Sequence, residues 1–303
     1  MTASATSRQE VPLWFDVDDE KLFGVHTVAG EPSRGIGVII AAGGGTPLST
    51  NVNDLSVRLM RRLAADGFDG FRFDYRGVGE STGTLDRFHL AEPFAPDMVA
   101  AAECLRRRGV ERFVLIGSCF GARTALAAAP QIGGVVQVIL VAPPVRDFEM
   151  GERIATRMAE RSRWSEYLRK AVKPQTLRNL TSRRARRAYF RLAKEKFRYV
   201  FTARKAPTDE QQARYGISPR FLDPLRSLVV SGVATSFIFG EEDDLLNDFE
   251  RARAGPLGEV LNSARGGVDF HTVPGEVHGF TSVSSQQHVF DAIIDQLSQT
   301  AVG

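Results

Sequence analysis

The sequence predicts an α/β fold in which a mostly parallel sheet is covered by helices on both faces. Short apolar segments with the composition of strands alternate with amphipathic segments along most of the chain, which is the pattern of a parallel sheet buried on both sides. One strongly basic segment interrupts this alternation, which indicates an inserted element. The 303 residues are enough for a large core and an insertion.

Strands and helices alternate before the insertion. A helix is expected at 51–67, where apolar residues recur at helical spacing and Gly67 provides a stop. Further helices are expected at 93–108 and from about residue 120. The expected strands are rich in β-branched and apolar residues; they are 22–28, 37–43, 68–75, 112–117 and 135–144. After the insertion, strands are expected at 234–240 and 268–273 and a closing helix at 284–300.

The insertion differs from the rest of the chain in charge. Residues 148–215 contain 19 Lys and Arg against 7 Asp and Glu, a net charge of +12, whereas the remainder carries −9. Two apolar stripes at helical spacing run through the segment, so it is expected to be helical and to bury those stripes. We therefore expect an inserted basic helical cap at 147–225 and a core domain formed by 1–146 and 226–303.

Composition argues against a secreted protein, a membrane-spanning protein and a metal-binding protein. Hydrophobic residues make up 43% and charged residues 25% of the chain, as in soluble globular proteins. The polar start MTASATSRQE predicts no secretory signal, and no apolar stretch is long enough to span a membrane. Only two cysteines are present, Cys104 and Cys119, which favours a reducing, cytoplasmic location. The five histidines have no metal-type spacing, so we expect neither a metal nor another cofactor.

The stretch Gly117-Ser118-Cys119-Phe120-Gly121 has the pattern of a nucleophile elbow between a strand and a helix. Such a turn is tight, which explains the flanking glycines, and its central residue projects at a helix N-terminus, where the dipole favours a thiolate. Cys119 could equally be an inert small residue in a tight turn. The five residues by themselves leave both interpretations open.

The order of motifs along the chain decides between them. Five motifs occur along the chain: the glycine run after the strand at 37–43, RFDYRGVGES (72–81), the elbow, FGEEDD (239–244) and VHGF (277–280). In this order the chain resembles the α/β-hydrolase superfamily, most closely the serine-aminopeptidase-like and exosortase-associated hydrolases. The resemblance implies an α/β-hydrolase fold with a mostly parallel eight-stranded sheet and an inserted helical cap. The elbow cysteine is similar to that of dienelactone hydrolases and some thioesterase-like members.

The resemblance implies a catalytic triad. Cys119 matches the nucleophile, Asp243 the acid and His278 the base, in the chain order typical of the family. Asp244 is the alternative acid. A surface position for His278 and a helix-capping role for Asp243 are the competing structural interpretations.

An oxyanion hole requires two backbone N–H groups. One is expected from Phe120, the residue after the nucleophile. The other is expected in the glycine run, where Gly44, Gly45 and Thr46 are candidates and Gly45 is preferred.

The expected activity is acyl transfer, of the thioesterase or acyltransferase type, through an acyl thioester on Cys119. An arginine-rich cap suits phosphate recognition, so acyl donors linked to CoA or to an acidic acyl carrier protein are the expected partners. The arginines could also form a solvated helix face. Nucleic-acid binding is not expected, because the aromatic residues of the cap fall on its apolar stripe. An ester or lactone hydrolase and a catalytically inactive binding module are the alternative functions.

Overall fold

The computed structural model describes residues 9–43, 48–85, 88–147, 216–278 and 282–300. The chain divides into two compact units, Met1–Asp147 with Gln211–Gly303, and Phe148–Glu210. The second unit lies outside the described residues, as does the helical structure expected for it. Within the described part of the chain, no helix is long and apolar enough to cross a membrane.

The first unit is built on one eight-stranded sheet with the order β1-β2-β4-β3-β5-β6-β7-β8. β1 pairs antiparallel with β2 and β2 antiparallel with β4, whereas all the other pairs are parallel. The predicted mostly parallel, eight-stranded sheet is therefore confirmed. The strands are β1 Glu10–Val17, β2 Glu20–Thr27, β3 Ile36–Ala41, β4 Asp69–Phe73, β5 Arg112–Ser118, β6 Val135–Val141, β7 Ala234–Gly240 and β8 Val268–Val273.

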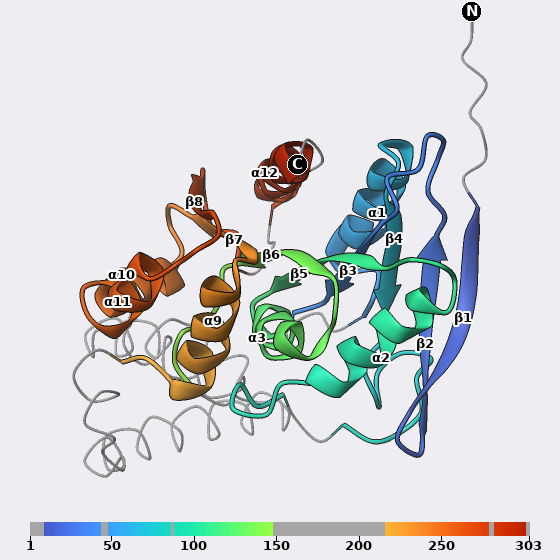
Figure 1. Cartoon of the computed structure of the whole chain (residues 1–303), viewed down its shortest axis with the longest axis horizontal. Coiled ribbons are helices and arrows are strands. Elements are labelled where there is room, and N and C mark those ends of the chain that lie inside the picture. The colour runs from blue at the N-terminus through green and yellow to red at the C-terminus, as the bar shows by residue number, and fades with distance from the viewer. Residues whose placement is uncertain (1–8, 44–47, 86–87, 148–215, 279–281, 301–303) are drawn as a thin grey trace, which may run out of the picture. The chain divides into compact units, whose positions relative to one another are not determined.

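Helices cover both faces of the sheet. Figure 1 shows α1 and α12 on one face and α2, α3 and α9 on the other. The helices are α1 Leu55–Ala65, α2 Ala95–Arg106, α3 Phe120–Ala128, α9 Pro219–Ser231, α10 Asp244–Arg253, α11 Pro256–Asn262 and α12 Val283–Thr300, with short 3₁₀ helices at Val52–Asp54 and Ala129–Gln131. The central strands β3 and β4 are buried along their whole length, because they are covered on both sides.

Several elements differ from the sequence prediction. The helices α10 and α11 were not expected. β1 was not expected, because Pro12 lies inside its apolar run; the structure tolerates this proline because β1 is an edge strand. Residues 219–225, which were expected to close the inserted cap, form the first half of α9. Since α9 packs against α3 and β7, it belongs to the first unit.

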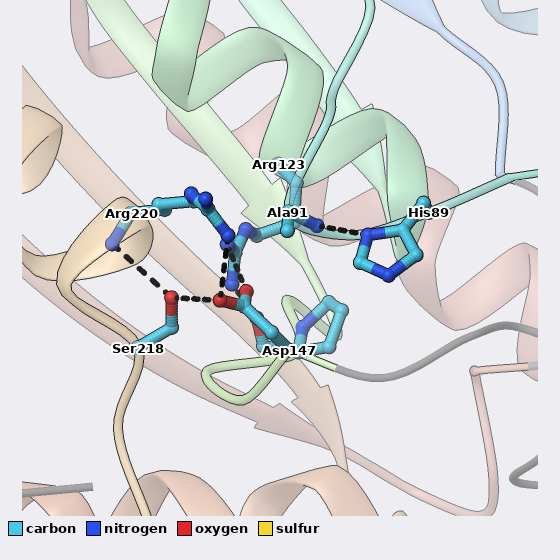
Figure 2. Close-up of polar contacts among 7 residues, drawn as sticks. His89, Ala91, Arg123, Asp147, Ser218 and Arg220 are labelled. Carbon is cyan, nitrogen blue, oxygen red and sulfur yellow. Dashed lines mark hydrogen bonds and ion pairs between the residues drawn. The ribbon is translucent and has the colours of Figure 1, made fainter. Parts of the chain in front are cut away.

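A buried ionic cluster joins the two points at which the chain leaves and re-enters the first unit (Figure 2). Arg123 of α3 is 1% exposed and donates to Oδ1 of Asp147 at 2.6 Å and to the Pro144 carbonyl at 3.2 Å. The Ser218 hydroxyl donates to Oδ2 of Asp147 at 2.6 Å and accepts from the Arg220 amide, which caps α9. Asp147 therefore links α3, through Arg123, to the start of α9, through Ser218.

Candidate active site

Cys119 lies in a strained turn between β5 and α3. Its φ of 50° and ψ of −111° are a combination that residues with a side chain rarely adopt. The Cys119 amide donates to the Val141 carbonyl of β6 at 2.9 Å, which holds the turn at the end of the sheet. α3 begins directly afterwards at Phe120. Cys119 is therefore presented at the N-terminus of a helix, where the dipole favours an anion.

The glycines on either side of the turn are required by close backbone approach. A Cβ on Gly117 would lie 2.1 Å from the carbonyl oxygen of Gly121, and a Cβ on Gly121 would lie 2.1 Å from that of Ala41. Both obstacles are backbone atoms, which cannot turn aside as a flexible side chain can. The first turn of α3 therefore sits directly on the ends of β3 and β5.

Ser118, one residue earlier, faces a different environment from Cys119. It lines a cavity of about 20 Å³ together with residues of α1 and α12, among them Leu55, Leu59 and Ile293. Since those helices cover the face of the sheet opposite to α3, Ser118 belongs to a small interior space on that side (Figure 1).

The structure brings Cys119 and His278 together. The Cys119 Sγ lies 3.1 Å from Nε2 of His278, which is within hydrogen-bonding distance for sulfur. Cys119 is 4% exposed and His278 is half-buried. His278 follows β8 and Cys119 follows β5, so both residues are supplied from the same edge of the sheet. An imidazole at this distance can take the proton of the thiol.

Asp243 joins the end of β7 to the loop that carries His278. Its carboxylate accepts from the Gly240 amide at 2.8 Å, the Val277 amide at 3.1 Å and the His278 amide at 2.9 Å. Burial raises the pKa of Asp243, and the three amide donors oppose that rise because they favour the charged form. Among the described contacts, Asp243 therefore reaches His278 through its main chain rather than through its ring.

The competing helix-capping interpretation does not fit Asp243. The residue occupies the N-cap position of α10, but its side chain makes no capping hydrogen bond to that helix. Asp243 is 2% exposed, whereas Asp244, the alternative acid, is half-buried in the first turn of α10.

Of the two expected oxyanion donors, Phe120 is described and Gly45 is not. Phe120 is the first residue of α3, while Gly45 falls within residues 44–47, outside the described part of the chain. Gly43 is a described residue of this loop that approaches the elbow, and an added Cβ there would lie 3.2 Å from the Ser118 carbonyl oxygen and 3.6 Å from Cβ of Cys119. Sequence reasoning missed Gly43, although it is the first glycine after β3.

Two further histidines and Cys104 lie in structural positions. His26 is buried and pairs with Asp69 at 2.6 Å, and His271 lies 2.7 Å from the Gln296 amide nitrogen. Cys104 is buried, and burial raises the pKa of its thiol. Within the described ranges, no group of His, Cys, Asp and Glu residues could hold a metal ion.

The comparisons with known proteins agree with this architecture. The chain resembles solved structures of a proline iminopeptidase from Mycobacterium smegmatis (17% identity, TM-score 0.57, 96% of this chain and 99% of that chain). It also resembles an esterase from Pyrococcus furiosus (15%, 0.59, 97% and 92%) and a dienelactone hydrolase from Anabaena variabilis (14%, 0.57, 96% and 98%). At these identities the likeness shows the fold alone.

No sequence among the curated proteins matches the chain significantly. The model of the alpha/beta hydrolase family matches residues 38–281, which is most of the chain. The chain therefore belongs to the alpha/beta hydrolase family.

Proposed function

We propose that this protein is a cysteine-dependent acyl-transfer enzyme of the thioesterase or acyltransferase type, in which Cys119 is the nucleophile. The observation that carries the proposal is the 3.1 Å separation between the Cys119 Sγ and Nε2 of His278 at a strained strand-to-helix turn. An inert buried cysteine requires neither a backbone with positive φ nor an imidazole within hydrogen-bonding distance.

In the first half of the reaction, His278 takes the thiol proton and the thiolate attacks the acyl carbonyl carbon. The carbonyl oxygen becomes an oxyanion, which the Phe120 amide and a donor from the loop after β3 stabilise. The tetrahedral intermediate then collapses. The bond to the leaving group breaks, the leaving group takes the proton from His278, and the acyl group stays on Cys119 as a thioester.

In the second half, His278 takes a proton from the acceptor, which is water, an amine, an alcohol or a thiol. The acceptor attacks the acyl-Cys119 carbonyl, and collapse of the second intermediate returns the proton to the cysteine sulfur. Asp243 serves this cycle by fixing the loop that carries His278 and by placing negative charge beside the imidazolium as it forms. Its bonds to the Val277 and His278 amides support that role.

Thioesters are the proposed acyl donors. Exchange between a thioester substrate and the Cys119 thiol is close to isoenergetic, and the resulting acyl-enzyme reacts readily with amines and thiols. The +12 charge of residues 148–215 supports a donor carried on CoA or on an acidic carrier protein, because arginine binds phosphates and carboxylates through forked hydrogen bonds. Within the described residues neither Cys104 nor Cys119 forms a disulfide, which supports action in the cytoplasm.

Intact-mass spectrometry of the protein after incubation with acyl thioesters tests this function. The expected result is a mass increase of one acyl group on Cys119, together with a burst of released thiol. An ester or lactone hydrolase would acylate from small esters or lactones and give no burst from thioesters. A protein whose Cys119 reacts with none of these reagents is an inactive binding module, and the proposal is then wrong.

A further inference from the structure

Two consecutive residues, Asp74 and Tyr75, hold the chain on both sides of the loop that follows β3. The Tyr75 hydroxyl donates to the Ala42 carbonyl at 2.9 Å, at the start of the loop. The Ser49 amide donates to Oδ1 of Asp74 at 2.7 Å, at the other end. Both side chains are buried, with 4% of Asp74 and 0% of Tyr75 exposed. Because the two residues are adjacent at the end of β4, they fix both ends of the loop relative to one strand.

The Asp74 carboxylate is itself held in place. It also accepts from the Glu80 amide at 3.3 Å, and the Ser81 hydroxyl donates to the Asp74 carbonyl at 2.7 Å. Gly79 passes so close that an added Cβ would lie 2.3 Å from Oδ2 of Asp74. The RGVGES stretch thus wraps around Asp74, which makes its carboxylate a fixed acceptor for the Ser49 amide.

Tyr75 also contacts the other side of the expected oxyanion hole. Its ring packs edge-on against Phe120 with centroids 5.9 Å apart, and against Phe94 at 5.3 Å. Burial raises the pKa of Tyr75, so its hydroxyl stays protonated and remains a donor to Ala42. One side chain therefore touches both Phe120, which follows the nucleophile, and the residue before Gly43.

Gly43 is the residue that this arrangement aligns. It follows Ala42 directly, and its backbone passes close to Ser118 and Cys119 at the elbow. A shift of the Ala42 carbonyl would move the Gly43 main chain relative to the Cys119 sulfur. Transition-state stabilisation by backbone N–H groups depends on such placement, and a misplacement of about 1 Å costs on the order of 100-fold in rate.

We propose that Asp74 and Tyr75 are positioning residues, which hold the main chain at Ala42, Gly43 and Ser49 so that the Gly43 amide beside the Cys119 elbow can donate to the oxyanion of an acyl substrate. This inference rests on the proposed function. In this proposal neither Asp74 nor Tyr75 contacts the substrate. Both act through the loop at Ala42, Gly43 and Ser49.

The test compares two reactions of the same thiol in the Tyr75→Phe and Asp74→Asn variants. Acylation by an acyl thioester or by a p-nitrophenyl ester passes through a tetrahedral oxyanion. Alkylation by iodoacetamide does not, since the sulfur displaces iodide from a CH₂ group while His278 takes the thiol proton. Rates of both reactions at Cys119 are measured by intact mass, and kcat and KM are measured separately with the better acyl donor.

Matched controls remove similar groups elsewhere in the sheet. Asp69→Asn changes a buried carboxylate at the opposite end of β4, where it pairs with His26. Ser236→Ala removes a buried hydroxyl of β7, which donates to Gln296. Both controls are expected to keep the wild-type acylation rate.

The expected result is a fall of about 10- to 100-fold in acylation rate and in kcat for both variants, with KM and the alkylation rate near the wild-type values. Equal losses in the acylation and alkylation rates would show that the elbow itself is disturbed. No loss in either rate would show that the loop needs no positioning. Both results overturn the inference. A wild-type protein that no ester or thioester acylates refutes the proposed function and this inference together, whereas acylation that the variants leave unchanged refutes this inference alone.

Discussion

The Sγ of Cys119 lies 3.1 Å from Nε2 of His278, although the two residues are 159 positions apart in the chain. They meet because β5 and β8 run parallel to each other in one sheet, so the turns that follow them open at the same edge. A thiol and an imidazole at this distance form the minimal unit of cysteine nucleophilic catalysis.

Removal of the Cys119 thiol is expected to abolish turnover. Cys119→Ala should lower kcat by several orders of magnitude, as loss of a triad nucleophile does, and should remove covalent labelling. Cys104→Ala should leave both unchanged, because burial raises the pKa of that thiol and keeps it protonated. Cys119→Ser should fold normally and lose most activity, since a hydroxyl needs stronger base assistance. Normal turnover in Cys119→Ala would disprove the mechanism.

Asp243, rather than Asp244, is expected to be the acid that supports His278. Asp243→Asn should lower kcat by about 100-fold or more, because it weakens the acceptor that holds the main chain of the loop carrying His278 and removes a buried negative charge near the imidazolium. Asp244→Asn should have a milder effect, because Asp243 is the buried carboxylate that accepts from the Val277 and His278 amides. Steady-state kinetics of the two variants measure kcat. If Asp244→Asn lowers kcat strongly and Asp243→Asn lowers it only slightly, Asp244 is the acid.

The basic segment is expected to recognise an anionic acyl donor. Charge interactions are screened over about 8 Å at physiological salt, so KM for a CoA-linked or carrier-linked substrate should rise with ionic strength. Reversal of Arg183, Arg184, Arg186 and Arg187 to Glu should raise this KM by about tenfold. Hydrolysis of a small neutral ester serves as the control. If both substrates respond equally, or neither responds, the arginines form only a solvated face.

Gly121→Ala is expected to destabilise the elbow. The added Cβ would lie 2.1 Å from the Ala41 carbonyl oxygen, and neither backbone segment can move without shifting α3 from β3. The cost should be about 3 kcal/mol or more in the free energy of unfolding. Gly267→Ala is the matched control, because nothing lies within 4 Å of the added carbon. Equal melting temperatures for the two variants in a thermal unfolding experiment would contradict the close approach.

Asp147→Asn is expected to be strongly destabilising, because it leaves Arg123 without its charged partner (Figure 2). Arg123 is 1% exposed, and breaking a buried ion pair from one side costs about 3–5 kcal/mol. Asp223→Asn, in an exposed pair with Arg226, should cost about 1 kcal/mol or less. Denaturant unfolding measures both variants. The double variant Arg123→Met, Asp147→Ala should recover part of the loss, and a failure to recover it would indicate that the damage is not electrostatic.

Motif order and apolar periodicity were enough to predict the fold. The strands at 234–240 and 268–273 were predicted with the bounds that the structure has, because both segments are rich in β-branched and apolar residues. β1 escaped prediction because Pro12 lies inside its apolar run, and proline is tolerated in a strand only at an edge such as this one. Local sequence also determined the elbow, because Gly117 and Gly121 are the residues that allow α3 to lie directly on β3 and β5.

Motif order named the triad candidates, whereas the tertiary structure decided the contacts between them. The short distance between Cys119 and His278 depends on the order of the strands in the sheet, and the contact of Asp243 with the main chain around His278 depends on how the loops after β7 and β8 pack. The same holds for Asp74 and Tyr75, which lie in the RFDYRGVGES stretch and which the fold bonds to both ends of the loop after β3. Periodicity reports which face of a segment is buried, whereas a hydrogen bond between distant residues depends on the relative positions of strand ends, which only packing of the whole sheet determines.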